Sequence, residues 1–190
     1  MIEAKTQLAK LLATEDITVR HSVTATTASF DVKARILTLP IWTVAEDMKD
    51  VLDMMTGHEV GHALWTEMFE WQKAIDEEKI HKQILNIVED ARIEKKIKRK
   101  YPGIVKSFIK GYGTLLDKGF FGEDANNPTQ LSLLDRINLH FKLGHTAAIP
   151  FNASEEWAVE AVAAAETFDD VKRVSKMLQI DHTETLYGKD

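Results

Sequence analysis

The spacing of apolar residues changes at Pro40, and this change constrains the possible folds more than any other feature of the sequence. Between Ile17 and Leu39 apolar and polar residues alternate, which is typical of short β-strands with one buried face. After Pro40 apolar residues recur every three or four positions almost to the end of the chain, which is typical of α-helices that bury one face. The sequence therefore predicts an α+β protein that is mainly helical and has a small N-terminal sheet.

The first 40 residues are expected to contain one short helix as well as the sheet. Residues 3–14 carry apolar side chains at helical spacing. The strand residues that follow turn back near Asp31 to Ala34, so we expect the sheet to be antiparallel. Pro40 should end the last strand, because proline lacks the N–H group that a β-ladder needs.

Helices are predicted for most of the remaining chain. The first should run from about residue 45 or 48 to residue 69, and the second from about 76 to 99, where Pro102 and Gly103 stop it. Glycines are frequent over residues 111–127, which predicts a loop or lid. Helical spacing returns from about residue 131 to a C-terminal cap at Gly144, continues over residues 155–166, and resumes at Thr167, where Asp170 completes a capping box.

Charge and composition exclude several classes of function. The formal net charge of −6 argues against nucleic-acid binding, so the basic run from Lys95 to Lys100 is interpreted as a solvated helix end. The chain contains no cysteine, so a metal site would have to use His, Asp or Glu side chains. It has no signal-peptide core and no run of about 20 apolar residues, so we expect a cytoplasmic protein without a membrane segment.

The segment His58-Glu59-Val60-Gly61-His62 lies in the middle of the first long predicted helix. Residues four apart lie on the same face of a helix, so His58 and His62 can bind one metal ion together. Glu59 is rotated by about 100° from His58, which lets it reach a metal-bound water without being a ligand. Zinc lowers the pKa of such a water to about 7, and the carboxylate can act as the general base in peptide hydrolysis.

A catalytic zinc needs a third protein ligand, and the second long helix offers three candidate carboxylates over residues 86–94. Measured from the apolar stripe of this helix, Glu89 points almost directly away from the stripe, whereas Glu94 lies near its margin. If the helix is sandwiched between the core and the histidine motif, Glu89 faces the metal. The sequence thus favours Glu89 as the third ligand. Asp90 is the alternative ligand, or the partner of a ligand histidine.

Two further roles are assigned to polar residues near these motifs. Arg92 either holds one of the carboxylates in its orientation or forms a surface ion pair. The oxyanion of a peptidase needs a hydrogen-bond donor, for which Tyr101, Tyr112, His140 and His145 are candidates. Among these we favour Tyr112, because it lies between two glycines in the predicted lid.

The chain is expected to form a single domain over residues 1–190, because its length and its apolar fraction of 44% suffice for one sizeable core. Within it, residues 1–40 should form the short helix and the sheet, residues 41–103 the two active-site helices, and residues 104–190 a helical lobe with the glycine-rich loop.

Two segments together resemble a known family. These are residues 57–66, Gly-His-Glu-Val-Gly-His-Ala-Leu-Trp-Thr, and residues 86–94, Asn-Ile-Val-Glu-Asp-Ala-Arg-Ile-Glu. The pair resembles the metallopeptidase-like region of bacterial and phage proteins that carry a von Willebrand factor A domain and are related to the cobaltochelatase CobT subunit. The similarity continues through residues 101–103 and 134–139 and covers most of the chain after Pro40.

The resemblance implies a zincin-like fold of the gluzincin branch, in which the third zinc ligand is a glutamate. In that branch an aspartate often follows the glutamate by four residues, a position that Ile93 occupies here. The family also implies a MoxR-type AAA+ ATPase as partner. In that family a von Willebrand domain normally follows the peptidase-like region; we expect these 190 residues not to include it, since they contain no Asp-x-Ser-x-Ser motif.

Two functions follow from these observations. The first is a zinc-dependent endopeptidase in which His58, His62 and Glu89 hold the metal and Glu59 activates water. Its peptide substrate could add as a strand to the sheet edge near residues 36–39. The second is a non-proteolytic adaptor or structural domain of an ATPase-linked complex, stabilised by zinc. An open coordination position beside a groove would favour the peptidase.

Overall fold

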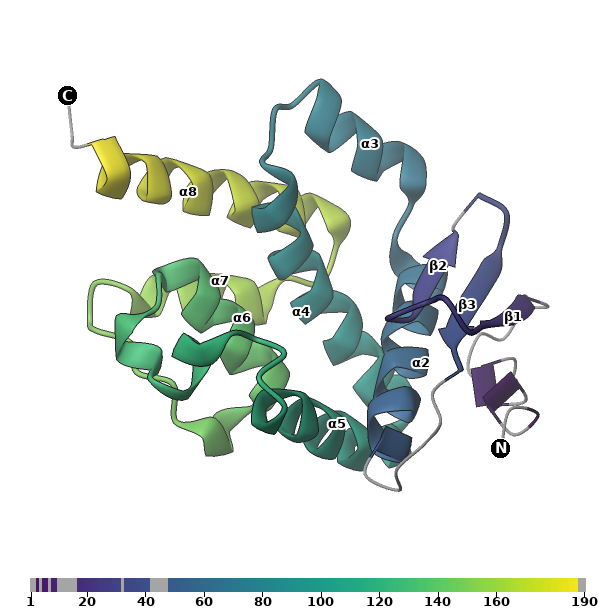
Figure 1. The fold of residues 1–190 in the computed structure, drawn as a ribbon. Coiled ribbons are helices and arrows are strands. Elements are labelled where there is room, and N and C mark those ends of the chain that lie inside the picture. The colour runs from purple at the N-terminus through teal and green to yellow at the C-terminus, as the bar shows by residue number, and fades with distance from the viewer. Residues whose placement is uncertain are drawn as a thin grey trace.

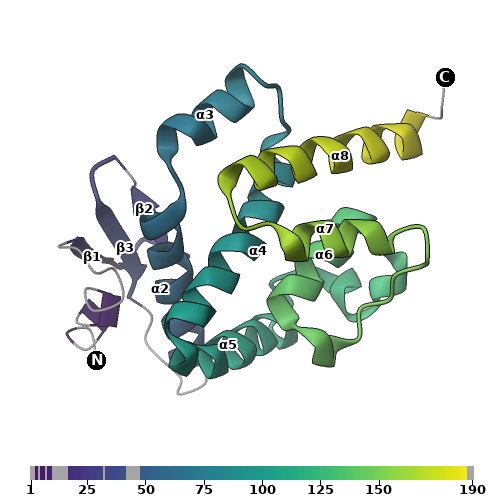
Figure 2. The same ribbon diagram turned by 180° about the vertical axis from the view of Figure 1, so that it is seen from behind.

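The computed structural model describes residues 3, 5–6, 8–9, 17–31, 33–41 and 48–187. Residues 3, 5–6 and 8–9 are helical, in agreement with the short helix predicted there. The rest of that helix and the start of the first long helix before Met48 lie outside the described residues. Figures 1 and 2 show the sheet at one end of the molecule beside α2 (Met48–Trp65), and the last three helices on the far side of α4 (Lys82–Lys100).

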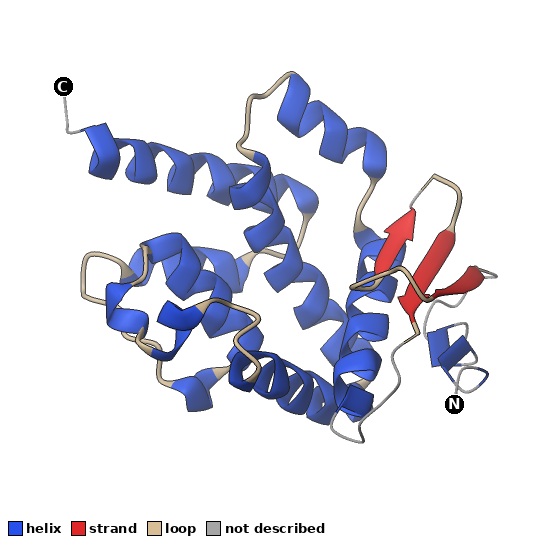
Figure 3. Ribbon diagram, in the orientation of Figure 1, coloured by secondary structure: helices blue, strands red, loops and turns tan. Residues whose placement is uncertain are grey.

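The protein is mostly helical, with strands confined to one edge (Figure 3). This agrees with the predicted α+β class. The remaining α-helices are α3 (Met68–Asp76), α5 (Val105–Asp117), α6 (Leu133–Leu143), α7 (Glu156–Ala164) and α8 (Phe168–Tyr187). Short 3-10 turns η1 (Pro102–Ile104), η2 (Glu123–Asn126), η3 (Pro128–Gln130) and η4 (His145–Ala147) connect some of them. None of the helices in the described part of the chain is long and apolar enough to cross a membrane.

The sheet is mixed rather than antiparallel. Its strands β1 (Thr18–Ser22), β2 (Ser29–Asp31) and β3 (Ile36–Pro40) lie in the order β1-β3-β2. The predicted turn pairs β2 and β3 antiparallel, whereas β1 pairs with β3 in parallel. The connection before β2 is long enough for β1 to skip that strand and lie on the other side of β3, and two reversals of direction make β1 and β3 parallel. Since β3 is paired on both sides, the prediction that residues 36–39 form the peptide-binding edge is wrong.

Three helix boundaries differ from the sequence-based expectation. The second long helix begins at Lys82 rather than near residue 76, because Asp76 is the last residue of α3. The first long helix ends at Trp65, and α3 is a separate helix after two residues that belong to neither helix, of which Glu67 is extended. Gly111, Tyr112 and Gly113 lie inside α5, so the predicted lid over residues 111–127 is a loop only after Asp117. The end of α6 at Gly144 is confirmed by a backbone φ of 79°, and the capping box is confirmed by the side chains of Thr167 and Asp170, which bond each other's backbone N–H.

Helices α4 and α5 both pack closely against α2. At Gly111 a Cβ atom would lie 2.8 Å from the backbone oxygen of Asp50, so only glycine permits the contact between α5 and α2. At Gly61 it would lie 2.9 Å from Cδ1 of Ile93, so this glycine brings α4 against the histidine motif. The close approach positions the side chains of α4 beside those of α2.

Helix α4 is buried on nearly all sides, because α2, α6, α7 and α8 all contact it. Eleven of its 19 residues are buried, and four of these carry charge: Glu89, Asp90, Arg92 and Glu94. Buried charges are costly unless they are paired or bind a metal ion. The partners of these four side chains therefore define the functional site.

Candidate metal centre

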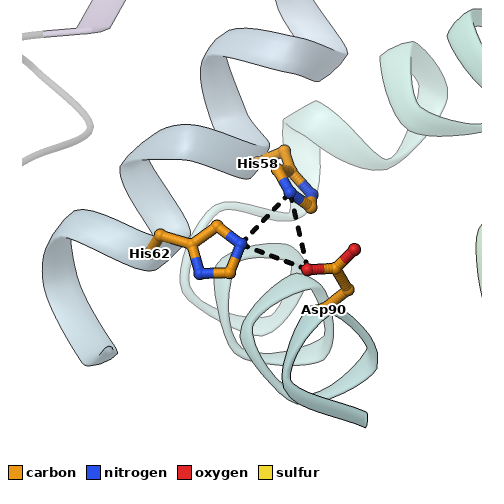
Figure 4. A group of neighbouring side chains, drawn as sticks. All are labelled: His58, His62 and Asp90. Carbon is orange, nitrogen blue, oxygen red and sulfur yellow. Dashed lines mark hydrogen bonds and ion pairs between the residues drawn. The ribbon is translucent and has the colours of Figure 1, made fainter. Parts of the chain in front are cut away.

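His58 and His62 lie on successive turns of α2, and their rings point to the same space (Figure 4). Their Nε2 atoms are 3.2 Å apart. The confirmed helix accounts for this geometry, since residues four apart in a helix lie on one face.

Hydrogen bonds to the other ring nitrogens fix which nitrogen of each histidine carries the proton. Nδ1 of His58 lies 2.9 Å from a carboxylate oxygen of Glu94, which can only accept, so Nδ1 donates. Nδ1 of His62 lies 3.0 Å from the hydroxyl of Thr66. That hydroxyl gives its single proton to Glu89 and therefore accepts from His62. When each ring is neutral with its proton on Nδ1, the lone pairs of both Nε2 atoms face the same space, so one cation lying there could bind both.

Asp90 completes this cluster with one carboxylate oxygen. Its Oδ1 lies 3.2 Å from Nε2 of His62 and 3.7 Å from Nε2 of His58. Burial raises the pKa of this carboxyl, but the charges of Lys142 and His58 and the bond to His62 outweigh burial and lower it well below its usual range. Asp90 is therefore ionised and available as a ligand.

The three atoms fit a zinc ion. Bond lengths of about 2.0–2.2 Å from zinc to nitrogen and oxygen place tetrahedral ligand atoms about 3.3–3.6 Å apart. The observed separations of 3.2, 3.2 and 3.7 Å are close to these values. Within the described residues, His58, His62 and Asp90 are the group whose geometry could hold a metal ion. Each histidine also has the hydrogen-bonded outer partner that metal-binding histidines normally have.

Glu89, the favoured third ligand, does not reach this cluster, whereas Asp90, the alternative ligand, lies in it. Its carboxylate is fully buried and accepts two hydrogen bonds of 2.8 Å from Arg92 and one of 2.5 Å from Thr66. The prediction assumed that one apolar stripe defines the buried side of α4. Because α4 is buried all round, the stripe does not tell which side faces α2.

Arg92 holds Glu89 in place, as one of the two sequence-based interpretations proposed. It is 3% exposed, which contradicts a surface ion pair. Its guanidinium also donates to the backbone oxygens of Trp65 and Glu166 at 2.8 and 3.3 Å. The bonds from Arg92 through Glu89 and Thr66 to His62 thus connect α4 with the end of α2.

Glu94 takes the role of outer partner that the sequence left to Asp90. Besides His58, it accepts hydrogen bonds from the hydroxyl of Tyr112 and, at 3.2 Å, from Nζ of Lys98. Burial raises the pKa of the Glu94 carboxyl, but Lys142 and the bond to His58 outweigh burial and lower it to about 2. An ionised carboxylate at this position makes His58 a stronger ligand.

Tyr112 lies at the site but differs from its expected role. It is buried in α5 rather than carried on a lid, and its hydroxyl donates to Glu94. The proton of the Tyr112 hydroxyl therefore points to Glu94 and not to the position of a substrate oxyanion. The structure does not bring Tyr101, His140 or His145 into the metal cluster, and the rings of His140 and His145 pack on each other at 5.4 Å.

Lys142 belongs to the site and was missed by the sequence analysis. Its Nζ lies 3.1 Å from Oδ2 of Asp90, 3.3 Å from the hydroxyl of Tyr112 and 3.7 Å from Glu94. Burial lowers the pKa of its ammonium, but the neighbouring oxygens of Tyr112, Asp90 and Glu94 raise it well above its usual value. A lysine in the last turn of a helix is common because of the helix dipole, so the sequence carries no signal of this role.

Glu59 separates two hollows beside the cluster. The first, about 170 Å³, is lined mainly by apolar side chains of α2, α5 and the loop after α5; the second, about 150 Å³, lies between β2, α2 and α3. Burial raises the pKa of the Glu59 carboxyl, although the two histidines and a hydrogen bond from the backbone of Phe30 in β2 act against this. The carboxylate is thus a stronger base than a solvated one and is open to both hollows.

No protein-family model, curated protein or solved structure matches this chain. The geometry of the site therefore carries the functional argument by itself.

Proposed function

We propose that the protein is a zinc-dependent peptidase in which His58, His62 and Asp90 hold the metal and Glu59 acts as general base. The observation that carries this proposal is the convergence of two Nε2 atoms and one carboxylate oxygen at ligand spacing. Glu59, next to His58 in the chain, lies beside the same cluster and faces two hollows.

The residues divide the chemistry among them. A zinc ion held by the three ligands would polarise a peptide carbonyl and lower the pKa of a water molecule to about 7. Glu59 takes the proton of the attacking water and delivers it to the leaving amine, a role for which its raised pKa is suited. Glu94 and Thr66 hold the rings of His58 and His62 in position, because each accepts a hydrogen bond from Nδ1 of one ring.

The edge strand β2 supports an extended peptide as substrate. β2 pairs with β3 on one side, and Phe30 on this strand lines the second hollow together with Glu59. A peptide lying along β2 would pass over Glu59 and place side chains in both hollows. Because the hollows lie on both sides of Glu59, residues can extend in both directions from the cleaved bond, which supports an endopeptidase.

The number of ligands favours catalysis over the zinc-stabilised adaptor. Structural zinc sites are closed by four protein ligands, whereas catalytic sites have three and an open position. In the part of the chain that the structure describes, the candidate cluster contains three. The MoxR-type ATPase partner rests on the sequence resemblance alone and stays a prediction.

Metal analysis and peptide cleavage test the proposal together. The purified chain should contain about one zinc ion per molecule, and it should cleave an unfolded protein such as casein in a chelator-sensitive reaction. Glu59→Gln should retain the zinc and lose at least about 100-fold of the rate, since general-base catalysis contributes about 10²–10⁴-fold.

The matched control is Glu67→Gln, which makes the same change at an exposed carboxylate just beyond α2 and should leave the rate unchanged. Full activity of Glu59→Gln would disprove the mechanism. Zinc binding without cleavage of any unfolded substrate by the unmodified chain would favour the adaptor.

A further inference from the structure

The two oxygens of Asp90 face different partners. Oδ1 faces the histidine nitrogens, whereas Oδ2 accepts hydrogen bonds from Nζ of Lys142 at 3.1 Å and from the amide of Asn86 at 3.3 Å. The carboxylate is therefore oriented with one oxygen toward the metal position and the other toward α6.

Lys142 is held in this place from several sides. Its side chain is 12% exposed, its Nζ lies 5.0 Å from the centre of the Tyr112 ring, and it donates to the Tyr112 hydroxyl. Glu94 lies 3.7 Å away. The ammonium thus stands between the two carboxylates of α4 that face α2.

We propose that Lys142 is a positioning residue that restricts Asp90 to binding the metal through Oδ1 alone, which keeps a coordination position open. This inference rests on the proposed metal centre. Carboxylates can bind a metal ion through one oxygen or through both, and a second oxygen would occupy the space that water and substrate need.

Two effects of Lys142 act in the same direction. The hydrogen bond from Nζ occupies Oδ2, and the positive charge repels a divalent cation at the distance of a few ångströms. Both effects weaken metal binding. Loss of Lys142 should therefore strengthen it, which is the opposite of what loss of a ligand or of a merely structural contact would do.

Asn86 provides an internal comparison. Its amide donates to the same oxygen of Asp90, but it is neutral and the residue is exposed. Removal of Asn86 tests the hydrogen bond without the charge.

The experiment compares Lys142→Met, Lys142→Arg and Asn86→Ala in the full chain. Zinc affinity is measured by competition with a chromogenic chelator, and the visible spectrum is recorded after cobalt replaces zinc. Lys142→Met should bind zinc at least about tenfold more tightly, because a nearby like charge is removed. Its cobalt absorption should weaken, because bidentate Asp90 raises the coordination number.

Lys142→Arg and Asn86→Ala are the control variants. Lys142→Arg keeps the charge and should restore the affinity and the spectrum of the unmodified chain, whereas Asn86→Ala should change the affinity by less than about threefold, since it removes a neutral hydrogen bond. If Lys142→Met does not fold, as judged by circular dichroism, Lys142→Gln gives the same comparison.

Weaker zinc binding, or an unchanged cobalt spectrum, in the neutral Lys142 variant would overturn the proposal. Failure of the unmodified chain to bind zinc or cobalt is a different result, because it would remove the metal centre itself.

Discussion

Helices α2 and α4 supply the two halves of the candidate metal centre, and they do so in different ways. α2 places His58 and His62 one turn apart, so its half is set by the geometry of a single helix. α4 supplies three carboxylates, and each bonds a different set of neighbours. Glu89 bonds Thr66 and Arg92. Asp90 bonds His62, Asn86 and Lys142, and Glu94 bonds His58, Tyr112 and Lys98.

The difference shows how neighbouring acids acquire different roles. Asp90 and Glu94 are four residues apart, as are the two histidines, and Asp90 meets His62 while Glu94 meets His58. The acid pair of α4 therefore faces the histidine pair of α2 in reverse order, as expected for two antiparallel helices. Glu89 is rotated by about 100° from Asp90 and faces Arg92 and Thr66 instead. A shift of one position along α4 separates a candidate ligand from a structural carboxylate.

The largest expected effect is on stability, in Glu89→Gln. The change leaves the buried guanidinium of Arg92 without its charged partner, and breaking one member of such a pair costs about 3–5 kcal/mol. Chemical denaturation should show this loss in the free energy of unfolding. If Glu89→Gln instead unfolds like the unmodified chain but no longer binds zinc, Glu89 is the ligand and the comparison between the two acids fails.

The next effect is on metal binding, in Asp90→Asn. We expect the zinc affinity to fall by more than about 100-fold, since outer partners alone account for about 10–100-fold and Asp90 contacts the metal position directly. Isothermal titration with zinc checks this. Because Glu94 and Tyr112 still surround Lys142, the free energy of unfolding without metal should fall less than in Glu89→Gln. If Asp90→Asn lowered the free energy of unfolding more than Glu89→Gln does, the assignment of Asp90 as ligand and Glu89 as structural carboxylate would be contradicted.

The smallest effect concerns the packing that holds α2 in place. Gly111→Ala would force its new methyl group against the backbone of Asp50 and should destabilise the protein by about 1–3 kcal/mol. Gly113→Ala is the matched control in the same helix, where a Cβ atom meets nothing within 4 Å. It should stabilise the protein by up to about 1 kcal/mol, because alanine favours a helix more than glycine does. Equal effects of the two variants in thermal unfolding would contradict the close contact between Gly111 and α2.

Features that depend on neighbours within about four residues could be predicted from the sequence. These include the helix that carries His58, Glu59 and His62, the cap at Gly144 and the capping box at Thr167. Each depends on hydrogen bonds or side-chain positions that a few consecutive residues determine. The turn between β2 and β3 was predicted for the same reason, since it lies within a short segment.

The tertiary structure decided what depends on the rotation and packing of whole elements. It placed β1 beside β3, put Asp90 rather than Glu89 next to the two histidines, turned the Tyr112 hydroxyl to Glu94 and brought Lys142 from α6 to the site. A helix that is buried on all sides has no apolar stripe that reports its rotation, and a contact between residues 52 positions apart has no local signal. The sequence by itself determined that two histidines and one glutamate lie together on a helix; the packing of α4, α5 and α6 determined which side chains surround them.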